Sequence, residues 1–259
     1  MIIVAENLNT RNKAYMAALK ARDRKAIEDI INRVIAKNPD YINVQCSLDG
    51  SEDEDNLPYV TEIVTRAGMK VCLDSRNIEA LKKAITFCKE PPIINYLSAD
   101  EDNPDEILNL VKRSNAGLII RALKGTVPNT LEAKLMILED LIEKANLADI
   151  PNGRLYADPS VVHIGGGTGQ DHIVNVRECL VVLNEMVEPP INTIAWISNI
   201  STGAPKNIKS RLNAAFLYYM AGAGLDAAIV DVMDDEVARA IYLIKTFRDE
   251  MVFSPAQVA

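Results

Sequence analysis

The chain has 259 residues, of which 48% are hydrophobic and 25% charged, and its formal net charge is -8. This acidic balance, without any basic cluster, argues against a broad nucleic-acid surface. No apolar stretch reaches the roughly 18 residues of a membrane span, and the start "MIIVAENLN" does not resemble a signal peptide. We expect a cytoplasmic protein with reduced thiols and no metal site, because the cysteines are widely spaced: Cys46, Cys72, Cys88 and Cys179.

Short apolar runs alternate along the chain with longer segments of helical periodicity. The runs, which we interpret as strands, cover 2–5, 41–46, 70–74, 92–96, 117–122, 154–158, 193–198 and 225–230. The clearest helical patterns cover 13–36, 130–148, 171–187, 206–222 and 234–248. Asn77 is a candidate N-cap, and Asn103 followed by Pro104 is another helix start.

This alternation predicts about eight βα units without any linker or repeat. Eight units in this length are typical of a (β/α)8 TIM barrel, so we expect one domain spanning 1–259. A doubly wound open sheet is the alternative. The sequence disfavours that alternative, because the glycine signature G-x-G-x-x-G does not follow the first strand.

Polar residues stand where the predicted strands end. In a barrel, these ends meet at one mouth, where ligands bind. Each residue alone is typical of a turn or helix cap, but together they predict a ring of hydrogen-bonding groups with few cations. Carboxylates suit the adjacent N–H groups of an aminopyrimidine edge, and carboxamides suit a lactam. The ring comprises Glu6, Asn7, Asn9, Asn43, Gln45, Asp74, Asn95, Asp158, Asn199 and Asp231.

Several short motifs, taken in order, carry a family resemblance over nearly the whole chain. They are "AENLN", "CLDS", "IIN", "YADPS", "ISNIS" and "GLDAAIVD". This set resembles the pterin-binding barrel of folate-dependent, corrinoid-linked methyltransferases of anaerobes. The resemblance implies that Asp74, Asn95 and Asp158 hold the pterin ring, and that Asn199 reaches its N5 atom and is the catalytic residue. Glu6, Asn9 and Asn43 would complete the pterin site.

The same resemblance implies the reaction and the partners. A methyl group would move between the cobalt of a corrinoid protein and N5 of tetrahydrofolate, in a direction that the sequence leaves open. Cobalamin would be supplied by a separate protein, because the chain lacks the motif Asp-x-His-x-x-Gly. We also expect a homodimer.

The sequence departs from the family pattern in two places. The second strand often ends in Asp-x-Asn, whereas here it reads Tyr41-Ile42-Asn43. The segment 160–172 is unusually rich in glycine. We interpret this segment as a loop that leads to an N-cap at Asp171 and that is placed to act as a lid. A metal site at His163, His172 and Asp171 fits no standard zinc spacing.

Two charged segments remain open to a functional or a structural interpretation. The acidic segment 49–56 is expected to be a solvated loop, with docking of a partner as the alternative. The basic segment 206–211 either meets the glutamate tail of a folate or forms a solvated helix face.

Two other functions stay open. One is a dihydropteroate synthase-like enzyme, which shares the pterin barrel but must bind a pyrophosphate. Its last strand typically leads into Arg-x-His, where this chain has the acidic "VDVMDDE". The other is a folate-binding scaffold for a corrinoid protein without catalytic activity.

Overall fold

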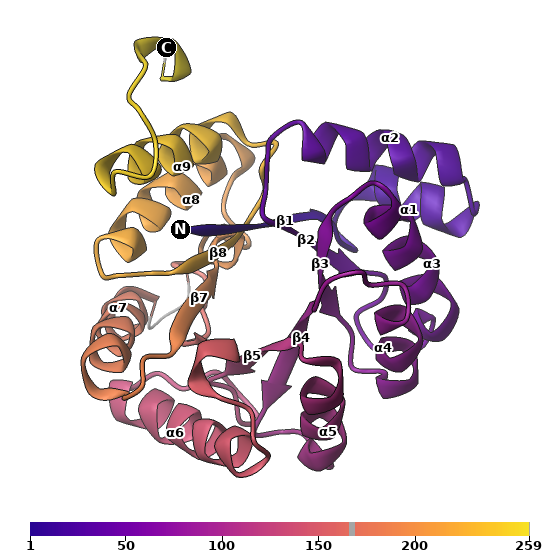
Figure 1. The fold of residues 1–259 in the computed structure, drawn as a ribbon. Coiled ribbons are helices and arrows are strands. Elements are labelled where there is room, and N and C mark those ends of the chain that lie inside the picture. Colours follow the sequence, from indigo (N-terminus) through magenta and orange to yellow (C-terminus); the bar gives the residue numbers. More distant parts are fainter. Residues whose placement is uncertain (166–168, 259) are drawn as a thin grey trace.

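The computed structural model, which describes residues 1–165 and 169–258, contains a closed barrel of parallel strands (Figure 1). Each strand pairs with the next in the sequence, and β8 closes the barrel against β1, with Ile2 in register with Ala227. The predicted (β/α)8 TIM barrel is therefore confirmed. The strands are β1 (Ile2–Leu8), β2 (Tyr41–Gln45), β3 (Lys70–Asp74), β4 (Ile93–Ser98), β5 (Gly117–Arg121), β6 (Leu155–Asp158), β7 (Asn192–Trp196) and β8 (Ala227–Val230).

Helices surround the barrel on its outside (Figure 1). Their apolar faces pack on the outward side chains of the strands, forming the larger hydrophobic core. The α-helices are α1 (Lys13–Lys20), α2 (Arg24–Ile35), α3 (Asp53–Arg66), α4 (Ile78–Ile85), α5 (Pro104–Ser114), α6 (Leu131–Leu147), α7 (Gly169–Met186), α8 (Lys206–Ala221) and α9 (Asp235–Phe247). Short 3-10 helices are η1 (Asn152–Arg154), η2 (Ile197–Ser201) and η3 (Pro255–Gln257).

A second, smaller core fills the inside of the barrel. Every strand except β2 contributes a buried side chain to this inner core. Tyr41 of β2 is partly buried and packs against it. Because side chains alternate between the two faces of a strand, this inner layer fixes which later residues also point inward. The inner layer is made of Val4, Cys72, Ile93, Ile119, Tyr156, Ile194, Ala227 and Ile229.

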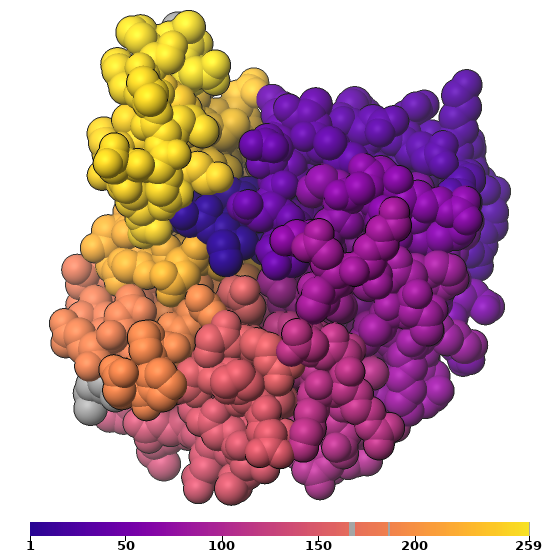
Figure 2. Space-filling model, in the orientation of Figure 1, coloured from indigo at the N-terminus to yellow at the C-terminus, as the bar shows by residue number. Residues whose placement is uncertain are grey.

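The chain beyond α9 leaves the barrel and forms a protrusion, drawn in yellow (Figures 1 and 2). At its base, the amino group of Met1 lies 2.6 Å from the carboxylate of Glu250. This ion pair places the base of the protrusion at the start of β1, opposite the carboxyl ends of the strands. No helix in the described part of the chain is long and apolar enough to cross a bilayer.

The first helical segment is broken into two helices, so the prediction of one helix over 13–36 was wrong. Arg22 adopts a left-handed φ of 52°, which ends α1. The carboxylate of Asp23 then accepts a hydrogen bond from the Ala26 amide at 3.0 Å and caps α2. Aspartate is a favoured N-cap, and this signal was present in the sequence.

The other predicted helix starts differ in their outcome. Asn77 caps α4 as expected, with its side-chain oxygen 3.0 Å from the Ala80 amide. Asn103 occupies the N-cap position before Pro104, but its side chain makes no capping hydrogen bond with the residues that the structure describes.

The two segments expected to be loops are partly helical. Asp53 to Asn56 form the first turn of α3, and Asp53 is buried, with Ser75 Oγ donating to its Oδ2 at 2.5 Å. The prediction of a loop over 49–56 was therefore wrong for 53–56, and the prediction of solvation was wrong at Asp53. In the other segment, α7 begins at Gly169, so Asp171 lies inside the first turn and not at the N-cap. Residues 166–168 of the expected lid lie outside the described residues.

Candidate functional site

Six of the ten polar strand ends predicted from the sequence lie one inward position beyond the inner core layer. A residue two positions after an inner-core residue points to the same side of its strand. The apolar layer is thus followed, toward the carboxyl ends, by a layer of polar side chains and one indole. These residues, which we call the polar rim, are Glu6, Gln45, Asp74, Asn95, Arg121, Asp158, Trp196 and Asp231, with Asn43 one inward position below Gln45.

One sector of the polar rim is a chain of hydrogen bonds across β2, β3 and β4. Asn95 Nδ2 donates to Asn43 Oδ1 at 3.2 Å, and Asn43 Nδ2 donates to Asp74 Oδ2, also at 3.2 Å. Gln45 Nε2 donates to the same Asp74 oxygen at 2.9 Å. The structure therefore brings together four residues of the predicted ring. Burial raises the pKa of Asp74 to about 6, although the hydrogen bonds from Asn43 and Gln45 oppose this rise.

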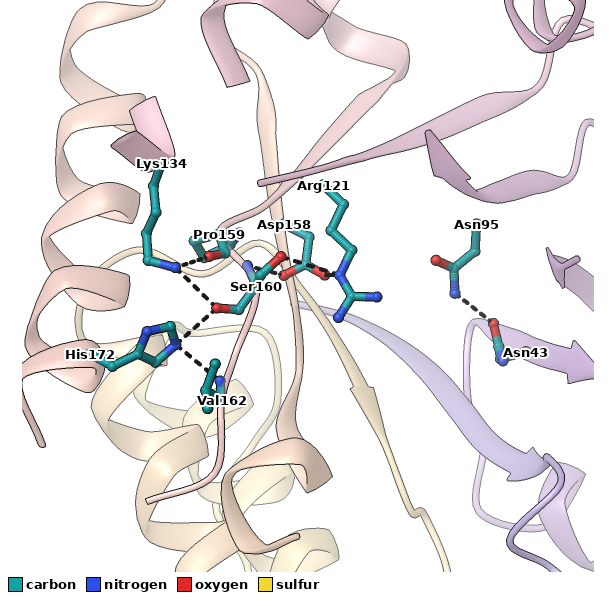
Figure 3. Close-up of polar contacts among 9 residues, drawn as sticks. All are labelled: Asn43, Asn95, Arg121, Lys134, Asp158, Pro159, Ser160, Val162 and His172. Atoms are coloured by element: carbon teal, nitrogen blue, oxygen red, sulfur yellow. Dashed lines mark hydrogen bonds and ion pairs between the residues drawn. The ribbon is translucent and has the colours of Figure 1, made fainter. Parts of the chain in front are cut away.

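The neighbouring sector contains Asp158 and an arginine that the sequence analysis missed. Arg121 Nε lies 3.5 Å from Asp158 Oδ2, and the Ser160 amide donates to Asp158 Oδ1 at 2.8 Å (Figure 3). The guanidinium also lies over the ring of Tyr96, 4.9 Å from its centroid. Burial raises the pKa of Asp158, whereas Arg121 lowers it. Arg121 was read only as the end of the apolar run 117–122, yet it follows the inner residue Ile119 by two positions.

A third sector joins β1 to β7 through a buried carboxylate. Glu6 Oε2 accepts hydrogen bonds from Trp196 Nε1 and from Ser198 Oγ, the latter at 2.9 Å. Burial raises the pKa of Glu6 to about 7, against the lowering effect of these two hydrogen bonds. Asn9 Nδ2 donates to the Glu6 carbonyl at 2.5 Å, so Asn9 orders the turn after β1.

A cavity of about 590 Å³ opens beside this third sector. Glu6 and Asn9 line it, together with Ser198 and two cations, Arg11 and Lys209. Lys209 comes from the basic segment 206–211, which forms the start of α8. The predicted residues thus do not form one group, because the side chains of Asn43, Asp74, Asn95 and Asp158 lie outside this lining, and Asn199 is not part of it either.

Asn199 lies in η2, directly after β7, and is partly buried. Its carbonyl accepts a hydrogen bond from the Thr202 amide at 3.1 Å. Its side chain makes no hydrogen bond or ion pair with any other part of the chain that the structure describes. Ser198 and Ser201, on either side of it in η2, line the cavity. The carboxamide of Asn199 is therefore not committed to holding the turn.

A comparison with known families decides the membership of this chain. The profile of the pterin binding enzyme family matches residues 42–231. The chain belongs to this family. Its matched region contains five of the polar strand ends expected to form the site, namely Asn43, Asp74, Asn95, Asp158 and Asn199.

Individual relatives carry more specific names. The methylcorrinoid:tetrahydrofolate methyltransferase of Eubacterium limosum is 25% identical over 246 residues, covering 93% of this chain and 89% of the relative. Among solved structures, Xanthomonas albilineans dihydropteroate synthase in complex with 7,8-dihydropteroate has a TM-score of 0.72 at 16% identity, covering 98% and 95% of the two chains. The Yersinia pestis dihydropteroate synthase with a pterine-sulfa conjugate has a TM-score of 0.71 at 14% identity, covering 96% and 94%. At these identities, the structural likenesses establish the fold.

Proposed function

We propose that this protein is a methyltransferase that moves a methyl group between the cobalt of a corrinoid protein and N5 of tetrahydrofolate. The observation that carries the proposal is the alignment of nearly the whole chain with a relative named for this activity. The chemistry of the polar rim supports it, because the rim offers carboxylates and carboxamides from adjacent strands. Such groups suit the donors and acceptors of a pterin ring.

In this proposal, Asp74, Asn95 and Asp158 hold the aminopyrimidinone part of the pterin. Each carboxylate has acceptor capacity left for a ligand. Asp74 uses Oδ2 for Asn43 and Gln45, and no hydrogen bond to its Oδ1 is found within the described residues. Asn43 acts on the pterin site indirectly. Its amide nitrogen donates to Asp74 and its amide oxygen accepts from Asn95, so it holds both side chains in place.

Glu6 and Asn9 line the cavity beside the third sector. We therefore assign them to the part of tetrahydrofolate that would lie in this cavity. The cations Arg11 and Lys209 in the same lining suit the carboxylates of a glutamate tail. This assignment favours the first of the two interpretations of the basic segment 206–211.

Asn199 would contact N5. In the direction that methylates the folate, the N5 lone pair forms the new nitrogen–carbon bond, the cobalt–carbon electron pair stays with cobalt, and N5 then loses a proton. An amide has no pKa near 7, so Asn199 contributes an oriented dipole and not a proton. The free carboxamide in η2 is available for this contact without breaking any hydrogen bond described in the structure.

The direct test is a spectral assay under anaerobic conditions. Methylcobalamin, tetrahydrofolate and the protein should yield cob(I)alamin and 5-methyltetrahydrofolate, and the reaction should be faster when a methylated corrinoid protein replaces free methylcobalamin. Omission of the folate provides the control. Binding of tetrahydrofolate without methyl transfer from either donor would instead support the scaffold without catalytic activity.

Dihydropteroate synthase activity is the second candidate, because the solved structures with this fold include dihydropteroate synthases. That enzyme releases pyrophosphate, whereas the end of β8 here carries Asp231 and Asp234 in the cavity lining. This position thus lacks the Arg-x-His that the resemblance implies for a pyrophosphate site, whereas Arg11 and Lys209 of the same lining suit either a pyrophosphate or a glutamate tail. Formation of dihydropteroate from 4-aminobenzoate and a hydroxymethyl-dihydropterin pyrophosphate would overturn our choice.

A further inference from the structure

Lys134 of α6 is completely buried, which is rare for a lysine. Its ammonium donates to two main-chain carbonyls, Pro159 O at 2.6 Å and Ser160 O at 3.2 Å (Figure 3). Within the described residues, no carboxylate lies close enough to form an ion pair with it. Burying a charge without a counter-ion in contact is costly. Both acceptors of the Lys134 ammonium belong to the segment that directly follows Asp158.

Ser160 connects this lysine to Asp158. Its amide donates to Asp158 Oδ1 at 2.8 Å, and its hydroxyl accepts from Arg121 Nε at 3.2 Å. Its carbonyl accepts from Lys134, so each of its polar groups is engaged. Ser160 adopts a left-handed φ of 59°, which a non-glycine residue keeps only when its surroundings determine it.

His172 of α7 holds the same segment from a second helix. The amide of Val162 donates to His172 Nε2 at 3.0 Å, and Ser160 O lies 3.1 Å from the same nitrogen (Figure 3). Burial and the charge of Lys134 together lower the pKa of His172 to about 4, against the raising effect of Ser160 O, so the ring is neutral near pH 7. A neutral ring with its proton on Nδ1 can accept the hydrogen bond from the Val162 amide at Nε2, and Nδ1 then has no partner among the described residues.

We propose that Lys134, assisted by His172, is a positioning residue that fixes residues 159–162 and thereby sets the geometry and charge state of Asp158. The inference rests on the proposed function only in that Asp158 is there assigned to the pterin. Helices α6 and α7 hold the main chain just after β6 through these hydrogen bonds. Asp158, at the end of β6, presents its carboxylate to the polar rim. Lys134 therefore acts on the substrate through Asp158 and does not contact it.

The charges around Asp158 and Lys134 predict how the pKa of Asp158 responds when Lys134 is replaced. Asp158 is faced by Arg121 from β5 and by Lys134 from α6, and both lower its pKa. Lys134 is faced by Asp158, Arg121 and the Cys179 thiol of α7, and burial lowers its own pKa to about 8. Removing the ammonium should therefore raise the pKa of Asp158, an effect that loss of packing alone does not predict.

The experiment compares Lys134→Met and Lys134→Gln with the wild type. Lys144→Met, on the exposed side of the same helix, is the matched control. Carbon-13 NMR of labelled aspartate follows the titration of Asp158, whose signal is assigned by its loss in Asp158→Asn. We expect both Lys134 variants to raise the Asp158 midpoint by at least about 0.5 pH unit. We also expect them to weaken tetrahydrofolate binding at pH 7 by at least about fivefold.

The outcomes separate this inference from the proposed function. An unchanged Asp158 midpoint together with unchanged tetrahydrofolate affinity in the Lys134 variants would overturn the positioning role. If the wild type does not bind tetrahydrofolate, the proposed function fails, while the Asp158 titration still decides the inference. A third measurement needs no variant: in the wild type, the amides of Ser160 and Val162 should exchange hydrogen far more slowly than that of the exposed Glu90. Equal exchange rates would show that the segment is not held, and would overturn the proposal even if neither variant folds.

Discussion

Arg121 and Asp158 are register partners in the pairing of β5 with β6, and their side chains meet at the rim with Nε 3.5 Å from Oδ2. Both are largely buried, with side-chain exposures of 19% and 8%. Their position follows from the inner core, because each lies two residues beyond an inner-core residue, Ile119 or Tyr156. The packing of the barrel thus places a guanidinium beside the carboxylate that we assign to the pterin.

This pair predicts the effect of Arg121→Met. Asp158 would lose the group that most lowers its pKa, leaving a buried carboxylate without its ion-pair partner. We expect the free energy of unfolding at pH 7 to fall by about 3 kcal/mol, and tetrahydrofolate binding to weaken because Asp158 loses the partner that holds its carboxylate in place. Denaturant unfolding and calorimetry would measure the two effects. Arg113→Met, on the exposed surface of α5, is the control; equal stability of both variants would contradict the prediction.

Asp74 predicts that the stability of the folded chain falls as the pH rises. Burial raises its pKa from the ordinary 3.8 to about 6, so the folded state binds the proton more tightly than the unfolded state. The resulting stabilisation is complete below the unfolded value and is lost as the pH rises through about 6. Asp74→Asn removes the titration, so stability should vary less between these two values and should increase at pH 8, by about 2–3 kcal/mol.

The same variant should bind tetrahydrofolate more weakly, because the amide replaces a charged acceptor. Higher stability with weaker binding would show that Asp74 is kept for the ligand and not for the fold. Asp29→Asn, exposed on α2, is the control and should leave the pH profile of stability unchanged. A steeper profile in Asp74→Asn would contradict the assignment of the raised pKa.

The sequence was sufficient for the barrel and for most of its rim, for one physical reason. Parallel strands buried on both faces read as apolar runs, and the polar residues that end them are easily seen. Arg121 was missed because its run was judged by its apolar content. Counting two positions from Ile119 would have found it, as the same count connects Cys72 to Asp74.

Other features depend on contacts that no local pattern reveals. Lys134 lies in an amphipathic helix, where a lysine normally faces solvent. Its burial depends on two carbonyls more than twenty residues away in the sequence. The break between α1 and α2 was visible as an N-cap at Asp23, but a continuous apolar period outweighed it. The division of the predicted site into a hydrogen-bonded network across β2, β3 and β4 and a cavity lining that includes Glu6 and Asp231 also required the folded chain.

Glu6 and Trp196 predict a spectroscopic titration. Trp196 is the single tryptophan of the chain, and its Nε1 donates to Glu6. Since burial raises the pKa of Glu6 to about 7, the carboxyl should change charge near neutral pH and alter the indole environment. Tryptophan emission should therefore titrate with a midpoint near 7, and Glu6→Gln should abolish the transition. Fluorescence between pH 5 and 9 would measure it; a transition that persists in Glu6→Gln would assign it to another group.

The final prediction concerns Asn199, whose side chain is free of hydrogen bonds within residues 1–165 and 169–258. Asn199→Ala should therefore change the free energy of unfolding by no more than about 0.5 kcal/mol. Its effect should appear in the reaction, because only an interaction that is stronger in the transition state raises the rate. We expect methyl transfer to slow by roughly 10²–10³-fold while tetrahydrofolate binding weakens only a few-fold. Single-turnover absorbance measurements, with binding measured separately, would divide the two effects.

Asn199→Asp is the sharper variant, since it keeps the shape of the side chain and replaces the donor amide by an acceptor. It should also fold normally, and in the direction that takes methyl from N5, where the nitrogen regains its lone pair, it should lose the rate enhancement as fully as the alanine variant because it has no N–H to donate. Recovery of the wild-type rate in Asn199→Asp would show that only the shape or the acceptor matters. If Asn199→Ala itself transferred methyl at the wild-type rate, Asn199 would be an ordinary residue of the turn after β7, and the assignment of N5 to this side chain would fail.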